Sequence, residues 1–129
     1  MPLLDTWVWL EYFGGSDDPR VRAAVEGPDV STSIITVAEL SDTYERAGNP
    51  ALHERLAFIR SRGRVHELSE EAAMAAGPTK WSQRRKGHKM GLADAMVYAT
   101  AQEHGLELLT GDVGFSGLPG VCFLGKRPR

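Results

Sequence analysis

Asp94 is the residue whose position most strongly suggests chemistry. It is the only charged residue between Met90 and Ala101, a segment otherwise made almost wholly of apolar and small residues. A helix of this composition is hydrophobic nearly all round and is therefore buried. A buried carboxylate requires a cation, a hydrogen-bond network or a raised pKa. A purely structural role is therefore harder to defend for Asp94 than for the chain's other acids.

Three more acids are expected near Asp94. Asp5 and Asp112 each follow a segment that reads as a short buried strand, and open α/β sheets place their ligand crevice at the carboxyl ends of strands. Glu39 lies in the first turns of the helix after the second strand, so it should point toward the same edge. Taken singly, Asp5 could cap a helix, Glu39 could be an ordinary exposed glutamate and Asp112 could belong to a turn. Their joint order along the chain favours one shared acidic site.

Four converging carboxylates repel one another, and divalent cations are the simplest remedy. Oxygen ligands select Mg²⁺ or Mn²⁺ over Zn²⁺, for which the chain has no cluster of Cys or His at ligand spacing. Such ions polarise a phosphodiester and activate a water for in-line attack. The four histidines are scattered, and no glycine-rich phosphate loop is present. The pattern therefore predicts metal-assisted phosphodiester hydrolysis without a histidine base.

The elements that must position these acids alternate between strands and helices. Strands are expected at 2–4, 29–33, 65–68, 106–110 and 121–124. Helices are expected at 6–13, 19–26, 36–46, from 50 to Gly63, from 70 with a break or kink at Gly77-Pro78 before 79–86, and from 90 to Gly105. This series predicts one α/β domain over residues 1–129, with a mostly parallel five-stranded sheet in the order 3-2-1-4-5 and helices on both faces. Asp5 and Asp112 would then lie where the winding reverses.

Composition excludes several classes of protein. Hydrophobic content of 42% and charged content of 25% are those of a soluble globular domain, and no apolar run is long enough for a membrane span. The single cysteine, Cys122, rules out an internal disulfide framework and is expected to be a small core residue. With no signal peptide recognisable, a cytoplasmic location is expected.

The net charge of -2 argues against general coating of nucleic acid, but the basic residues are segregated. Five of the 15 lie between Lys80 and Lys89, and three more are Lys126, Arg127 and Arg129. RNA contacts are expected from Lys80, Arg84, Arg85 and Lys86, although a solvated charged face is an equally ordinary interpretation. Trp81 could stack on a base or anchor its helix, whereas Trp7, Trp9, Tyr12 and Phe13 are expected to pack.

The sequence resembles the PIN-domain nucleases and, within them, the VapC-like toxins of bacterial toxin–antitoxin pairs. The matching segments are Leu3-Leu4-Asp5-Thr6, Val37-Ala38-Glu39-Leu40, Leu92-Ala93-Asp94-Ala95 and Leu109-Thr110-Gly111-Asp112, followed by Phe115. Their order and spacing fit across essentially the whole chain.

The resemblance implies a PIN-like three-layer α/β/α fold in which Asp5, Glu39, Asp94 and Asp112 bind the metal. Thr110 would help to position the last of these acids. It also implies endoribonuclease activity with Mg²⁺ or Mn²⁺, a homodimer and a small VapB-like antitoxin that blocks the crevice. Neither the target RNA nor the antitoxin follows from these residues.

Two positions depart from the family pattern. Many relatives have a further acid two residues after the last motif aspartate, where this chain has Gly114, and Pro78 interrupts a helix that is often continuous. These departures keep two alternatives open: a catalytically weak module that binds RNA or an antitoxin, and a PIN nuclease of RNA processing outside a toxin–antitoxin pair. A receiver-like phosphotransfer domain would need an aspartate at the end of the third strand, where this chain has Leu68-Ser69.

Overall fold

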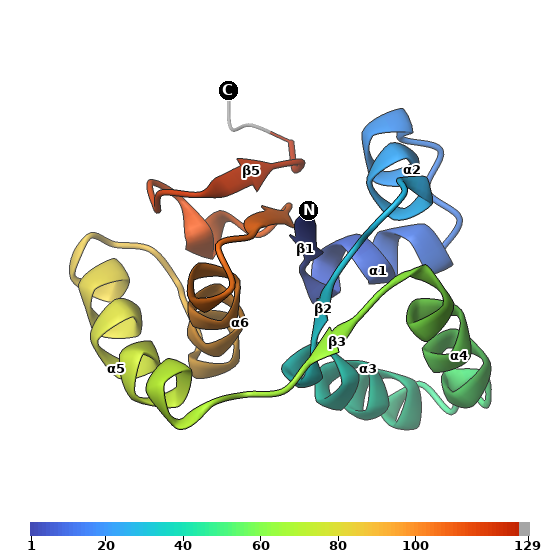
Figure 1. The fold of residues 1–129 in the computed structure, drawn as a ribbon, viewed down its shortest axis with the longest axis horizontal. Coiled ribbons are helices and arrows are strands. Elements are labelled where there is room, and N and C mark those ends of the chain that lie inside the picture. Colours follow the sequence, from blue (N-terminus) through green and yellow to red (C-terminus); the bar gives the residue numbers. More distant parts are fainter. Residues whose placement is uncertain (127–129) are drawn as a thin grey trace.

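The protein is a parallel β-structure covered by helices on both sides (Figure 1). In the computed structural model, which describes residues 1–126, the strands are β1 (Pro2–Leu4), β2 (Thr32–Ser33), β3 (Val65–His66), β4 (Glu107–Thr110) and β5 (Val121–Phe123). The helices are α1 (Thr6–Phe13), α2 (Pro19–Glu26), α3 (Ile34–Arg46), α4 (Leu52–Arg62), α5 (Glu70–Arg85), α6 (Leu92–Glu103) and the 3-10 turn η1 (Val113–Phe115).

The strands form two sheets rather than the continuous sheet that we predicted. One sheet has the order β1-β4-β5, the other pairs β2 with β3, and both are wholly parallel. A single parallel bridge between Leu3 and Ser31 joins them, with Leu4 N–H donating to Ser31 O and Ser31 N–H donating to Pro2 O. The parallel α/β architecture is confirmed, whereas the five-strand order 3-2-1-4-5 is not.

Two hydrophobic cores lie on opposite faces of the three-stranded sheet. Leu4 belongs to the core under α1 to α4, whereas its neighbour Leu3 belongs to the core under α5 and α6. Leu109 and Leu108 of β4 divide in the same way. Successive strand residues point to opposite faces, so the alternation places helices on both sides of the sheet. Figure 1 shows α5 and α6 together on one side and α1 to α4 on the other.

Helix α5 differs from our prediction at Gly77-Pro78. The helix continues from Glu70 to Arg85 with Pro78 inside it, so the predicted break is wrong. The proline removes one backbone donor from the helix and leaves the carbonyl of Met74 without that partner. Pro78 is exposed, so water can solvate this carbonyl, and α5 packs extensively against α6. Tertiary packing therefore overrides the local penalty.

The aromatic residues of α1 pack, as expected. Trp9 is fully buried, stacks on Phe13 with ring centroids 5.7 Å apart, and donates its indole N–H to Thr32 Oγ1 at 3.2 Å. Tyr12 stacks on Phe58 of α4 at 5.8 Å. These contacts join α1 to α4 and to β2, so the start of α1, which follows Asp5, is held firmly.

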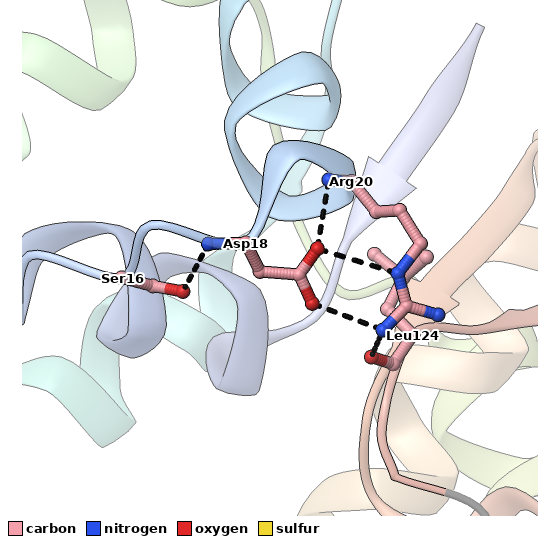
Figure 2. Close-up of polar contacts among 4 residues, drawn as sticks. All are labelled: Ser16, Asp18, Arg20 and Leu124. Atoms are coloured by element: carbon pink, nitrogen blue, oxygen red, sulfur yellow. Dashed lines mark hydrogen bonds and ion pairs between the residues drawn. The ribbon is translucent and has the colours of Figure 1, made fainter.

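Arg20 forms an ion pair with Asp18 and ties the start of α2 to Leu124, the residue after β5 (Figure 2). Asp18 caps α2 by accepting from Arg20 N–H at 2.9 Å, while its other oxygen binds the Arg20 guanidinium at 2.9 Å. The same guanidinium nitrogen donates to Leu124 O at 2.9 Å. Arg20 therefore links the start of α2 to the residue that follows the edge strand β5. Within residues 1–126, none of the helices could cross a membrane.

Candidate active site

Asp5 is held at the carboxyl end of β1 by the neighbouring strand β4. Its backbone N–H donates to Leu109 O at 3.0 Å, and its Oδ2 accepts from Thr110 Oγ1 at 2.7 Å. Asp5 is only 3% exposed and precedes α1, yet its side chain makes no capping hydrogen bond to that helix. The interpretation of Asp5 as a simple helix cap is therefore wrong. Its carboxylate is instead oriented by a buried threonine.

Two further threonines orient Glu39, and the sequence analysis did not identify their role. Thr6 Oγ1 lies 2.6 Å from Glu39 Oε1 and 2.9 Å from Thr36 Oγ1. Because a hydroxyl carries one proton, Thr6 donates to the carboxylate and accepts the proton of Thr36. Thr6 follows Asp5 directly, and Thr36 precedes Glu39 by one turn. The one-turn spacing of Thr36 from Glu39 is common in helices, and Thr6 is 33 residues from Glu39, so neither role has a specific sequence signal.

Asp94 lies in the first turn of α6, which begins two residues later than the expected start at Met90. The helix begins at Leu92, and Asp94 Oδ2 accepts from Gly91 N–H at 3.0 Å. Asp94 therefore has a capping role as well as its half-buried position. Asp112 behaves similarly, because its Oδ1 accepts from Gly114 N–H at 2.8 Å at the start of η1.

The pKa shifts show that the four acids repel one another. Burial raises the pKa of Asp5 to about 7, and repulsion from Asp94 and Glu39 adds to this against the hydrogen bond from Thr110. Burial likewise raises the pKa of Asp94 to about 6, with repulsion from Asp112 and Glu39 adding to it. Each acid therefore interacts with at least one of the others.

The donor set suits a hard divalent cation, but the acids do not form a finished ligand sphere. One oxygen of each carboxylate accepts a hydrogen bond from the protein. In the described part of the chain, no three acids, histidines or cysteines are placed to hold an ion as they stand. The fit therefore rests on the chemistry of four mutually repelling carboxylates at one edge.

Gln83 connects the basic half of α5 to the segment after Asp112, and no sequence pattern indicates this role. It is 1% exposed and donates both amide protons, to Gly114 O at 3.0 Å and to Ser116 O at 2.9 Å. Arg84 Nε donates to Met90 O at 2.9 Å, so one predicted RNA contact also holds the turn between α5 and α6.

The other predicted RNA contacts are exposed or partly buried. Arg85 and Lys86 are exposed, Lys80 is partly buried, and Lys80 Nζ lies 5.2 Å from the centroid of the Trp81 ring. Trp81 is 55% exposed, so it is no buried anchor. The basic residues Arg127 and Arg129 lie outside the described residues.

Close packing explains why a glycine occupies position 114. A Cβ at this position would lie 2.6 Å from Lys89 O and 3.2 Å from Asp112 Oδ1. A side chain of any kind would therefore push the turn before α6 away from η1. Gly114 therefore leaves no room for a further acid, but it lets the segment that carries His88 and Lys89 approach closely.

Comparisons with known proteins agree with this arrangement. The family model described as PIN domain matches residues 3–121. Ribonuclease VapC10 of Mycobacterium tuberculosis H37Rv is 31% identical over 137 residues, covering 100% of this chain and 99% of that protein.

Solved structures give the same result. A toxin-antitoxin complex from Klebsiella pneumoniae superposes with a TM-score of 0.71 at 28% identity, covering 95% of this chain and 96% of that chain. FitAcB from Neisseria gonorrhoeae superposes at 0.68 with 30% identity, covering 88% and 89%. VapBC2 from Rickettsia felis superposes at 0.73 with 17% identity, covering 95% and 96%, which supports the fold alone. The acidic edge, the parallel sheet and these similarities lead to one conclusion: the chain belongs to the PIN domain family.

Proposed function

We propose that the protein is a metal-dependent endoribonuclease of the VapC type, in which Asp5, Glu39, Asp94 and Asp112 hold Mg²⁺ or Mn²⁺. The observation that carries the proposal is the raised pKa of two carboxylates at one sheet edge, Asp5 and Asp94. Structural acids are normally arranged to avoid mutual repulsion, whereas acids that await a cation are not. The full-length similarity to a ribonuclease supports RNA as the substrate.

When bound, the cations would supply Lewis-acid polarisation of the phosphodiester and activation of a water. The chain's own residues orient the carboxylates for this task. Thr110 holds one oxygen of Asp5 and Thr6 holds one oxygen of Glu39, and the other oxygen of each acid would bind the ion. The proposal needs no histidine base, and the exposed Arg85 and Lys86 would meet phosphate.

The proposal extends to partners. The solved relatives include toxin-antitoxin complexes, which supports a VapB-like antitoxin that occludes the acidic edge. A homodimer and a cytoplasmic location complete the VapC-type proposal. The alternative outside a toxin–antitoxin pair predicts the same chemistry, and the presence of a small antitoxin gene immediately upstream would separate the two.

Cleavage of RNA by the purified protein with added Mn²⁺ tests the enzyme. We expect Asp94→Asn and Asp5→Asn each to abolish cleavage, whereas Asp42→Asn, an exposed aspartate on α3, should leave the rate unchanged. Cleavage that survives both active-site substitutions would come from a contaminating nuclease and would refute the proposal.

A catalytically weak binding module is the second candidate. It is favoured by the absence, within residues 1–126, of a finished ligand sphere. The two candidates differ in one measurement: a module would gain thermal stability from Mn²⁺ without cleaving RNA, whereas the enzyme would do both.

A further inference from the structure

A cavity of about 900 Å³ lies beside the acidic edge, between β5, η1 and the turn that joins α5 to α6. Val121 and Phe123 form its floor, because alternate residues of a strand share one face. Residues 87–89 form one wall and residues 113–118 the other. β5 is the edge strand of its sheet, so no further strand closes this side.

The cavity is built into the fold and is not a packing defect. Gln83, buried in α5, binds the backbone carbonyls of Gly114 and Ser116, and thereby sets the distance between the two walls. Gly87 and Gly117, one in each wall, have φ of +88° and +78°. Side chains are strained in this region of backbone space, and a Cβ at either glycine would meet only open space. The walls are therefore held apart by a buried amide and shaped by two turns that favour glycine.

The lining suits a ligand with an apolar body and negative charge. Phe123, Leu118 and Val121 supply apolar surface, while His88 and Lys89 are the ionisable side chains in the lining. No carboxylate lines the cavity in the described part of the chain, although four stand at the adjoining edge. The apolar surface and the two basic side chains therefore lie in the cavity, apart from the acids. This distribution suits a nucleotide, because its base and its phosphate can occupy different places.

The recess and the acidic edge are continuous along the backbone. Asp112 accepts from Gly114 N–H, and the residue between them, Val113, lines the cavity. Val113 is 51% exposed, so it forms a lip rather than part of the core. An RNA strand whose phosphate lies at Asp112 would therefore place an adjacent base at Val113.

We propose that this cavity binds a nucleobase of the RNA strand, adjacent to the phosphodiester at the acidic edge. The assignment rests on the proposed ribonuclease function for its substrate class. The apolar floor takes the planar face of the base, and Lys89 with His88 faces the attached phosphate. The cavity then decides which nucleotide lies next to the cleaved bond.

Binding of mononucleotides by the ¹⁵N-labelled protein, in EDTA so that no metal ion bridges the phosphate to the acids, tests the cavity. Stacking of a base contributes about 1–3 kcal/mol, so UMP or AMP should bind about fivefold to 150-fold more tightly than ribose 5-phosphate. The amide shifts should gather at residues 87–89, 116–118 and 121–123. Equal affinity for the nucleotides and ribose 5-phosphate, or shifts confined to α5, would overturn the proposal.

A matched pair of substitutions at the lip locates the effect. Val113→Glu places a negative charge beside the phosphate and should weaken nucleotide binding about tenfold, whereas the similarly sized but neutral Val113→Gln should stay within about threefold. Met74→Glu adds the same charge at a 71% exposed position of α5 outside the cavity, and should leave binding unchanged. Unaltered binding by Val113→Glu would refute the assignment.

The two proposals fail independently. Nucleotide binding without any RNA cleavage by the metal-loaded protein would refute the ribonuclease proposal and support the cavity. RNA cleavage without nucleotide binding at the cavity would do the reverse.

Discussion

Replacing Asp5 with asparagine should make the metal-free protein more stable at alkaline pH. Asp5 is buried, and its pKa lies at about 7 against an ordinary value of 3.8. Each pKa unit corresponds to about 1.4 kcal/mol, so the folded state prefers the neutral carboxyl by about 4 kcal/mol. Asparagine is neutral and nearly the same shape, and its amide oxygen can still accept the proton of Thr110.

The sign of the pH dependence follows from proton binding. Between pH 3.8 and about 7 the unfolded chain has released the proton of Asp5 while the folded protein retains it. Stability is therefore greatest in acid and falls as the pH rises through this window, reaching its full loss above the folded pKa. For Asp5 alone, the loss between pH 5 and pH 8 is about 3 kcal/mol. Asp94, whose pKa is also raised, contributes in the same direction.

Urea denaturation in EDTA, followed by tryptophan fluorescence at pH 5 and pH 8, measures this effect. Between pH 5 and pH 8, the free energy of unfolding should fall by about 3 kcal/mol more for the wild type than for Asp5→Asn. Asp42→Asn, an exposed aspartate, should follow the wild type. If the wild type and Asp5→Asn lose stability in parallel, the carboxylate of Asp5 is not desolvated in the folded protein and the reasoning fails.

Four further outcomes follow from the geometry. Mn²⁺ should raise the melting temperature more at pH 8 than at pH 5, because Asp5 and Asp94 must release protons before they can bind an ion; equal shifts in a pH series would contradict this. Gly114→Ala should destabilise the protein by about 1–3 kcal/mol through the clash with Lys89 O, and retention of full stability in urea would show that the turn yields freely. Gln83→Leu should cost about 2 kcal/mol by leaving two carbonyls without their donor, with faster amide exchange in residues 113–118. Pro78→Ala should stabilise α5 by about 1–3 kcal/mol in thermal unfolding, unless the proline's restriction of the unfolded chain offsets the gain.

Local sequence signals predicted the order and type of the elements well. Pro19 after Asp18, Ser69 before Glu70 and Gly63 after α4 each mark a helix end that the structure has. These signals depend on hydrogen bonds within a few residues, so they depend little on the tertiary context. The first strand has the predicted bounds, but the others are shorter than predicted, because their ends are set by pairing with distant strands.

Pairing between distant segments is also where the predicted five-strand order is not confirmed. The joint between the two sheets is a single bridge at Leu3 and Ser31. No pattern of residues in either segment distinguishes one bridge from a continuous ladder, because both require the same buried strand. Pro78 shows the opposite limit: a strong local signal for a break was overridden by packing of α5 on α6.

Gly114 shows why the threonines and the amide around the acids could not be found from the sequence. A missing acid at this position suggested a weaker metal site, but the structure shows a backbone contact with Lys89 that leaves no room for a side chain. Gln83 binds the backbone of Gly114 across 31 residues of sequence and holds this segment against α5. Thr6 bonds to Glu39 across 33 residues and to Thr36 across 30. The acids follow from strand ends and family pattern, whereas the groups that orient them follow from contacts between elements that only the folded chain brings together. Substitutions at Gln83 and Gly114 should therefore alter the acidic edge without changing any acid.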